Sequence, residues 1–195
     1  MGLIKDITGV VLAGGQSSRF GRNKALATWQ GKTLIQHVRD NLAEVFSDCL
    51  LSTNFPEQYA FLKMPTVLDR FRDMGPLAGI HAALRYTEKP WIFVVGCDMP
   101  AVTPEIIIFL CGFTGEKYEA VIPWLQTGPE PVCGLYHKTA LPEIEMQLRN
   151  KKTQLKELLG RLSVRKIAEE ELQKVAGARR VFVNVNREQD LTGLS

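Results

Sequence analysis

The sequence predicts an α/β protein in which helices cover both faces of a mainly parallel sheet. Its first β-like run, Ile7 to Ala13, is continuously apolar and rich in β-branched residues, which is typical of a strand buried on both faces. Shorter β-like runs then alternate with segments of helical periodicity, as they do in chains that build parallel sheets. The chain has 195 residues, 45% of them hydrophobic, and this is enough for a sizeable core.

The N-terminal elements follow from simple signals. The first strand runs into Gly14 and Gly15, where we expect a loop. Thr33 and Gln36 form a capping-box pattern, which favours the start of a helix. Apolar residues at helical spacing then predict that this helix continues to about Phe46. These residues are Leu34, Ile35, Val38, Leu42, Val45 and Phe46.

The middle of the chain carries more short β-like runs with helices between the earlier ones. The runs are Cys49 to Ser52, Thr66 to Leu68, Trp91 to Gly96, Ala120 to Pro123 and Val132 to Tyr136. One helix is expected after Pro76. Another is expected after Thr103, with Pro104 in its first turn, where proline is well tolerated.

Beyond Ala140 we expect two helices, roughly Leu141 to Asn150 and Gln154 to Leu162, then a polar stretch and a last strand, Val181 to Val185. No linker rich in Pro, Gly or Ser separates this part, and no internal repeat is present. We therefore expect a single domain over residues 1–195.

The charge balance and the apolar runs limit the partners. The net charge is +3, from 24 basic and 21 acidic residues, so we expect neither nucleic acid nor a membrane surface as a partner. The longest apolar stretches, Trp91 to Cys97 and Ile106 to Phe113, are shorter than the roughly 20 residues that span a bilayer. The N-terminus lacks the pattern of a signal peptide, and we expect a cytoplasmic protein.

The segment from Leu12 to Lys24 is the first candidate for chemistry. It joins three glycines and three cations after a buried strand. Glycines allow backbone N–H groups to approach phosphate oxygens, and Arg19 and Lys24 supply positive charge. The spacing matches neither a P-loop nor a G-x-G-x-x-G fingerprint. A Gly-rich turn with solvated basic side chains is the alternative.

Asp98 is the second candidate. It follows the apolar run that begins at Trp91 and precedes Met99 and Pro100. Ligands of open α/β sheets bind at the carboxyl ends of strands, and Mg²⁺ is usually held by one or two carboxylates with phosphate oxygens and waters. Asp98 is therefore a candidate Mg²⁺ ligand, unless it only caps a helix or forms a turn. Asp69 follows another strand and invites the same argument less strongly.

Two weaker signals complete the set. Gly75 and Pro76 lie where a charged loop runs into a helix, whose free N–H groups could face an anion, although a plain connecting loop has the same pattern. Asn184 and Asn186 flank Val185 at strand spacing, so that both amides share one face. Paired asparagines are equally common as turn formers.

Together these motifs resemble the molybdenum cofactor guanylyltransferase family. They are L-A-G-G-x-S-x-R-x-G-x-x-K at 12–24, Asp69 with G-P-L-A-G at 75–79, C-D-M-P at 97–100 and F-V-N-V-N at 182–186, and the match runs in order from Val10 to Leu191. The resemblance implies a Rossmann-like nucleotidyltransferase fold. It also implies a reaction that joins GMP from GTP to the terminal phosphate of molybdopterin and releases pyrophosphate, with Mg²⁺ as the metal.

The resemblance assigns roles residue by residue. GTP would be bound by Leu12, Ala13, Gly14, Gly15, Lys24, Asn54, Asp69 and Asp98. Arg19, Lys24 and Asp98 would be catalytic, and Asp98 would hold Mg²⁺. Molybdopterin would be bound by Gly75, Pro76, Asn184 and Asn186. Residues 1–100 would form the nucleotide half and residues 101–195 the acceptor half. Other molybdenum cofactor biosynthesis proteins, or the target enzymes, would be transient partners.

Two departures and two alternatives accompany the resemblance. Phe20 stands where the family often has methionine, and Arg22 and Asn23 add bulk and charge beside Gly21. A molybdopterin cytidylyltransferase or a sugar-nucleotide pyrophosphorylase would use the same scaffold. A nucleotide-binding protein that delivers the cofactor without chemistry is the alternative from another class.

Overall fold

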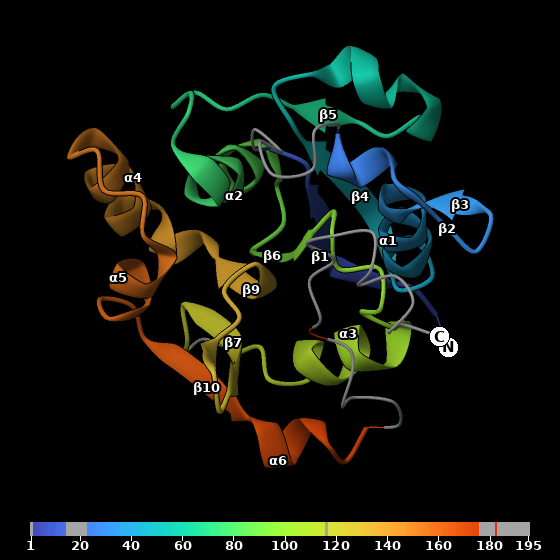
Figure 1. Cartoon of the computed structure of the whole chain (residues 1–195). Coiled ribbons are helices and arrows are strands. Elements are labelled where there is room, and N and C mark those ends of the chain that lie inside the picture. The colour runs from blue at the N-terminus through green and yellow to red at the C-terminus, as the bar shows by residue number, and fades with distance from the viewer. Residues whose placement is uncertain (1, 15–22, 116, 176–181, 183–195) are drawn as a thin grey trace.

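The computed structural model describes residues 2–14, 23–115, 117–175 and 182 (Figure 1). Within these ranges one sheet of eight strands forms the centre of the molecule, in the order β10-β7-β9-β6-β1-β4-β5, with β8 paired to β7. Its strands are β1 (Ile4–Leu12), β4 (Phe46–Ser52), β5 (Thr66–Val67), β6 (Trp91–Gly96), β7 (Ala120–Leu125), β8 (Gly128–Pro129), β9 (Cys133–His137) and β10 (Val164–Ala168). Strands β2 (Thr28–Trp29) and β3 (Lys32–Thr33) form a separate hairpin.

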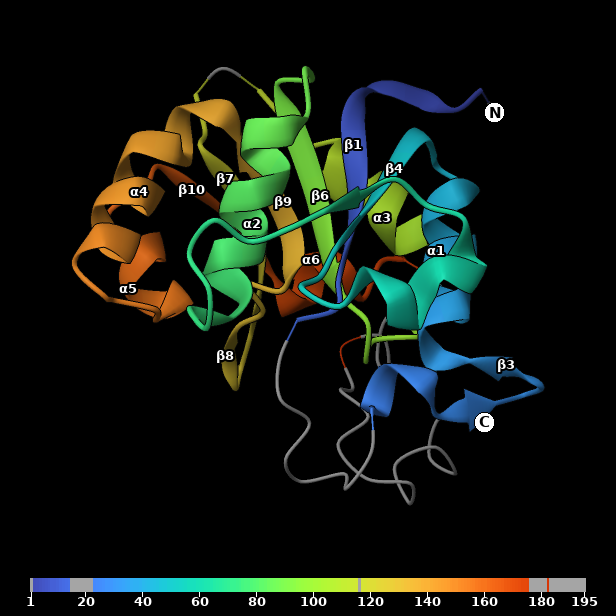
Figure 2. The ribbon, with the colours of Figure 1, turned by 90° about the horizontal axis from the view of Figure 1, so that it is seen from above.

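Helices cover both faces of this sheet (Figures 1 and 2). One face carries α1 (Leu34–Ala43), α3 (Pro104–Cys111) and α6 (Glu169–Leu172). The other carries α2 (Gly75–Tyr86), α4 (Leu141–Arg149) and α5 (Leu155–Leu159). Among the described residues, three short 3₁₀ helices join these elements: η1 (Lys24–Leu26), η2 (Pro56–Leu62) and η3 (Lys138–Ala140). None of the described helices combines the length and the apolar character needed to cross a membrane.

Strand β1 shows why the first apolar run predicts a central strand. It pairs in parallel with β4 on one side and β6 on the other, and every residue from Ile7 to Leu12 is buried or carries no side chain. Its side chains alternate between the two cores, since Val11 packs on the α1 side and Val10 on the α2 side. The predicted α/β class with a mainly parallel sheet is confirmed.

The sheet is not parallel throughout, because β9 pairs antiparallel with both β6 and β7. Strands β7 and β10 then pair in parallel again. This arrangement follows from the short connection between β7 and β9. A hairpin-like return through β8 leaves no room for the crossover helix that a parallel pair needs.

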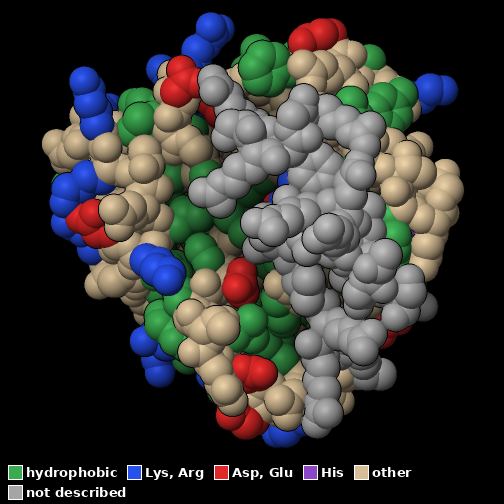
Figure 3. All heavy atoms as spheres, viewed as in Figure 1, with side chains coloured by type: hydrophobic (Ala, Val, Ile, Leu, Met, Phe, Trp, Pro, Cys, Tyr) green, Lys and Arg blue, Asp and Glu red, His purple; other side chains and the backbone are tan. Residues whose placement is uncertain are grey.

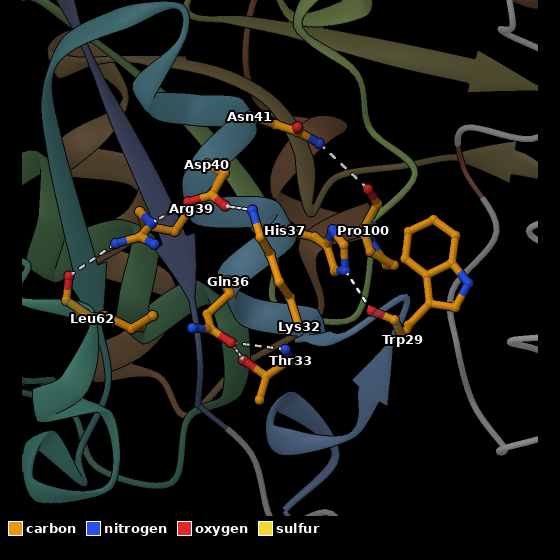
Figure 4. A network of polar contacts seen from close by, with 10 residues as sticks. All are labelled: Trp29, Lys32, Thr33, Gln36, His37, Arg39, Asp40, Asn41, Leu62 and Pro100. Atoms are coloured by element: carbon orange, nitrogen blue, oxygen red, sulfur yellow. Dashed lines mark hydrogen bonds and ion pairs between the residues drawn. The ribbon is translucent and has the colours of Figure 1, made fainter.

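The prediction that the first helix continues to Phe46 is wrong. Helix α1 begins after Thr33 as expected, and the Thr33 N–H donates to Gln36 Oε1 at 2.9 Å (Figure 4). The helix ends at Ala43, however, and Phe46 is the first residue of β4, where it pairs with Ile4 of β1. The Phe46 ring lies beside Gly9, where an added Cβ would come within 2.7 Å of it. The end of the helix is therefore set by the pairing of β4 with β1, and the spacing of apolar residues does not reveal it.

The prediction for the C-terminal part is correct for its two helices and misses the two elements that follow them. Helices α4 and α5 correspond to the predicted pair with shorter bounds. The polar stretch after them, for which no helix or strand was predicted, contains β10 and α6. The sequence of β10 does not look like a strand because it carries charged residues whose cations pack on aromatic rings. Lys166 lies over the Trp124 ring at 4.1 Å and Arg165 over the Phe113 ring at 4.9 Å. The predicted strand from Val181 to Val185 lies outside the described residues, apart from Phe182.

Gly134 in β9 gives a test of this packing. A Cβ at this position would lie 2.7 Å from the Val121 carbonyl oxygen and 2.8 Å from Ile122 Cδ1, so the backbone of β7 would have to shift. We expect Gly134→Ala to lower the free energy of unfolding by about 1–3 kcal/mol, measured by urea denaturation. Gly115→Ala is the matched control, because a Cβ there meets no atom within 4 Å. Equal stability of the two variants would contradict the close approach of β9 to β7.

Candidate active site

The carboxyl ends of three parallel strands form the edge at which the predicted site residues meet. Leu12 of β1 is in register with Ser52 of β4 and with Gly96 of β6. Backbone bonds extend this register, since Ala13 N–H donates to Ser52 O at 2.9 Å and Cys97 N–H to Leu12 O at 3.0 Å. The segments that follow the three strands therefore leave the sheet side by side, at the place where open α/β sheets bind ligands. Figure 3 views this edge and shows hydrophobic side chains in a hollow, with acidic side chains at its border.

Lys24 and Asp98 meet at this edge. Lys24 Nζ lies 2.8 Å from Asp98 Oδ2, and the two side chains are 14% and 28% exposed. They are 74 positions apart in the chain, so the fold brings together two residues that the sequence predicts separately. Both side chains are partly exposed, so phosphate oxygens or a cation can contact the pair.

Gly96 and Asn41 hold the Asp98 carboxylate in place. A Cβ at Gly96 would lie only 2.6 Å from Asp98 Oδ1, so the absence of a side chain lets the carboxylate fold back over the end of β6. Asn41 of α1 reaches the loop after Asp98, where its Nδ2 donates to Val102 O at 2.9 Å. Figure 4 shows its second, longer bond, to Pro100 O at 3.4 Å. The buried Met99 fixes the same loop from inside the core. The carboxylate is thus positioned by the fold itself.

These groups fit a hard cation such as Mg²⁺. Asp98 offers carboxylate oxygens over the space at Gly96 that a Cβ would fill, and its partial exposure leaves room for oxygens of a substrate. In the described ranges no group of three His, Cys, Asp or Glu residues has the geometry of a metal site. Mg²⁺ does not need one, because phosphate oxygens and waters usually complete its six ligands.

Glu130 is a second acidic group near Asp98 that the sequence did not single out. Strand β6 pairs with β9 in a register that joins Trp91 to His137 and Val95 to Cys133. Glu130, which precedes β9, is close enough to Asp98 for the two charges to interact. Burial raises the pKa of Glu130, while the charge of Lys156 lowers it and that of Asp98 raises it. Two carboxyl groups, Glu130 and Asp98, are therefore close to one another at this edge.

A pocket of about 540 Å³ lies at the same edge and includes Gly14, which follows β1. Its lining residues are Gly14, Asn54, Phe55, Asp69, Arg72, Asp73 and Gly75. Three of them, Gly14, Asn54 and Asp69, are residues that the resemblance assigns to GTP, and they come from the ends of three different strands. The fold thus gathers these predicted residues around one cavity of a size that suits a small molecule.

Asn54 and Asp69 form a mutual pair in the wall of this pocket. Asn54 Nδ2 donates to Asp69 Oδ2 at 2.9 Å, and the Asp69 N–H donates to Asn54 Oδ1 at 3.1 Å. Burial nevertheless raises the pKa of Asp69, and the hydrogen bond from Asn54 counteracts this effect. A carboxylate held in this way can accept hydrogen bonds from the N–H groups of a ligand, and its partial burial strengthens them.

Of the remaining predicted residues, two lie at or beside the pocket and four lie outside the described residues. Gly75, which we assigned to molybdopterin, lines the same pocket as the residues assigned to GTP, and Pro76 follows it in the first turn of α2. Which substrate they contact stays a prediction. Gly15, Arg19, Asn184 and Asn186 lie outside the described residues, and their roles stay predictions as well.

Sequence reasoning missed several pocket residues. Phe55, Arg72 and Asp73 line the cavity, yet they belong to loops without a periodic pattern. A signal was present for Arg72 and Asp73, because the charged loop that contains them was noted as a whole. Phe55 carried no such signal; its ring is 49% exposed, an unusual position for an aromatic side chain beside a polar cavity.

Comparisons with known proteins agree with this geometry. Residues 9–167 match the family model of the MobA-like NTP transferase domain. A probable molybdenum cofactor guanylyltransferase of Bacillus cereus (strain AH820) is 34% identical over 187 residues, which cover 93% of this chain and 92% of the relative. One with the same name from Carboxydothermus hydrogenoformans is 35% identical over 187 residues, covering 96% and 94%.

A solved structure is also similar to the chain over most of its length. It is molybdopterin-guanine dinucleotide biosynthesis protein A from Archaeoglobus fulgidus, with a TM-score of 0.82 and 28% identity, and the likeness covers 96% of each chain. The sheet and helices that position the site are therefore shared with a solved protein.

Proposed function

The chain belongs to the MobA-like NTP transferase family, and from this premise we propose that it transfers GMP from GTP to the terminal phosphate of molybdopterin, releasing pyrophosphate. Relatives at 34% and 35% identity that carry the guanylyltransferase name support this choice within the family. One observation in the structure supports it most. The Lys24–Asp98 pair and the pocket of Gly14, Asn54 and Asp69 occupy the same edge of the sheet.

In the proposed reaction the terminal phosphate of molybdopterin is the nucleophile. One of its oxygens attacks the α-phosphorus of GTP, the bond from that phosphorus to the bridging oxygen breaks, and pyrophosphate leaves with the electron pair. The attacking phosphate is already anionic near neutral pH, so the protein needs to supply position and positive charge more than a base. The Cys97 thiol beside the site suits no nucleophilic role, because burial raises its pKa to about 12.

Lys24 would contact the phosphates of GTP and stabilise the charge that moves to the leaving pyrophosphate. Asp98 would hold Mg²⁺, which when bound would neutralise phosphate charge and align the oxygens. Asn54 and Asp69 would bind the nucleoside part within the pocket. Arg19 would add charge near the α-phosphate, and Gly75, Pro76, Asn184 and Asn186 would contact the acceptor.

We also propose the cytoplasm as the place of reaction, with transient contacts to other molybdenum cofactor biosynthesis proteins or to the target enzymes. The substrates support this, since a nucleoside triphosphate is plentiful there. These contacts need no large basic or apolar surface of the kind that a permanent complex requires.

Base choice tests the proposed function directly. With molybdopterin and Mg²⁺ present, we expect GTP to be used at least about tenfold more efficiently than CTP, a difference of about 1.4 kcal/mol in transition-state binding. The measurement is pyrophosphate release at matched concentrations of GTP, CTP and ATP. Equal use, or a preference for CTP, would refute the guanylyltransferase assignment and leave the nucleotidyltransferase family in place. Binding of GTP without any release would favour a delivery protein instead.

A further inference from the structure

Asn23 makes hydrogen bonds through both the nitrogen and the oxygen of its side-chain amide. Its Nδ2 donates to Gln58 Oε1 at 2.7 Å and to the Tyr59 hydroxyl at 2.9 Å. Its Oδ1 accepts from the Ala25 N–H at 3.1 Å and so caps η1. All the bonding groups of this one amide are used.

The other end of the contact is rigid. Tyr59 belongs to η2, is only 5% exposed and packs in the core on the α1 side of the sheet. The Tyr59 hydroxyl also lies 3.2 Å from Asn23 Oδ1, so it contacts both the nitrogen and the oxygen of the Asn23 amide. Asn23 is therefore tied to the core through a side chain that cannot readily move.

Asn23 directly precedes Lys24, the first residue of η1. This helix has only three residues, too few to fix itself. It is held by the Asn23 cap at its start and at its end by the Leu34 N–H, which donates to Ala27 O at 2.9 Å. The backbone at Lys24 is thus restrained from both sides.

Such restraint matters for a lysine. Its ammonium is a point charge on a flexible stem, and ordering that stem at a phosphate costs side-chain entropy. A backbone fixed in advance at the root of the stem removes the further cost of ordering the backbone, and it starts the stem at the site edge, where Nζ lies 2.8 Å from Asp98.

We propose that Asn23 and Tyr59 are positioning residues that hold Lys24 for the phosphates of the nucleotide. The inference rests on the proposed function. It adds two residues to which the family resemblance assigned no role, joined across 36 positions of the chain. Tyr59 also lies in the segment that follows Asn54, so the same anchor fixes the phosphate side of the site relative to the pocket.

The test compares GTP with guanosine, because an anchor of Lys24 acts on the phosphates and leaves the nucleoside unaffected. Binding is measured by calorimetry without molybdopterin. We expect Asn23→Ala to weaken GTP binding by about tenfold and Tyr59→Phe by about threefold, with guanosine affinity unchanged in both. Asn23→Asp is the conservative variant, since its carboxylate can still cap η1 and accept from the Tyr59 hydroxyl. We expect it to regain most of the GTP affinity that Asn23→Ala loses.

Thr87→Val is the matched control. It removes a buried hydrogen bond, Thr8 Oγ1 to Thr87 Oγ1 at 2.6 Å, at the end of the sheet away from the site. It should lower the melting temperature and leave the ratio of GTP to guanosine affinity unchanged. Should Tyr59→Phe and any folded Asn23→Ala protein also keep that ratio, Asn23 and Tyr59 are only structural. Failure of the unmodified protein to bind GTP would instead refute the proposed function.

Discussion

Replacing Asp98 by asparagine is expected to lower turnover by about a hundredfold or more, which corresponds to about 2.7 kcal/mol in the barrier. The variant keeps the shape of the side chain over Gly96 and removes the charge that a hard cation requires. It keeps the Lys24 cation that would face the phosphates, so binding of GTP alone should change much less than turnover. The measurements are steady-state pyrophosphate release over a range of Mg²⁺ and calorimetric binding of Mn²⁺ as a probe of the metal site.

Asp40→Asn is the matched control for this change. Asp40 also accepts from a lysine, Lys32 at 2.7 Å, but on the outer surface of α1 (Figure 4). Its variant should retain turnover and Mn²⁺ binding. Near-normal turnover of Asp98→Asn at saturating Mg²⁺, with an unchanged melting temperature, would show that Asp98 is structural and would refute its role as the metal ligand.

The elements that the sequence predicted best are those whose pattern depends on burial alone. Strand β1 is apolar throughout because both of its faces are covered, and such a run has few other interpretations. The same holds for β6, which the sequence placed at Trp91 to Gly96, the bounds that the structure has. Asp98 could be predicted for this reason, since a polar residue directly after a buried central strand lies at the ligand-binding edge.

The parts that the sequence did not predict depend on contacts between distant residues. Phe46 continues a helical spacing, and only its pairing with Ile4 makes it part of a strand. In β10 the charged residues hide a strand, because their stems and cations pack on rings from other elements. The bond between Asn23 and Tyr59 spans 36 positions and leaves no periodic signal. The local sequence pattern indicates which residues are buried, whereas these three features depend on contacts between residues that are far apart in the chain.

Replacing Lys24 by methionine should have the second large effect, because the stem is kept while the charge that faces the phosphates is lost. We expect GTP binding to weaken by about tenfold and transfer to slow by about a hundredfold, since the charge on the leaving pyrophosphate grows in the transition state. Titration with GTP in the absence of molybdopterin separates the two effects. Lys32→Met, which removes the surface partner of Asp40, is the control and should change neither.

The double variant of Lys24→Met with Asp98→Asn shows whether the two groups act as a unit. They are 2.8 Å apart, within the range where effects on free energy are not additive. Removing Lys24 alone leaves the Asp98 carboxylate facing the phosphates without its partner, so Asp98→Asn should restore part of the GTP affinity that Lys24→Met loses. Turnover should stay low in the double variant, because the metal ligand is still missing. Strictly additive losses in GTP affinity would mean that Lys24 and Asp98 contact the nucleotide independently, and the paired site described for this edge of the sheet would then be wrong.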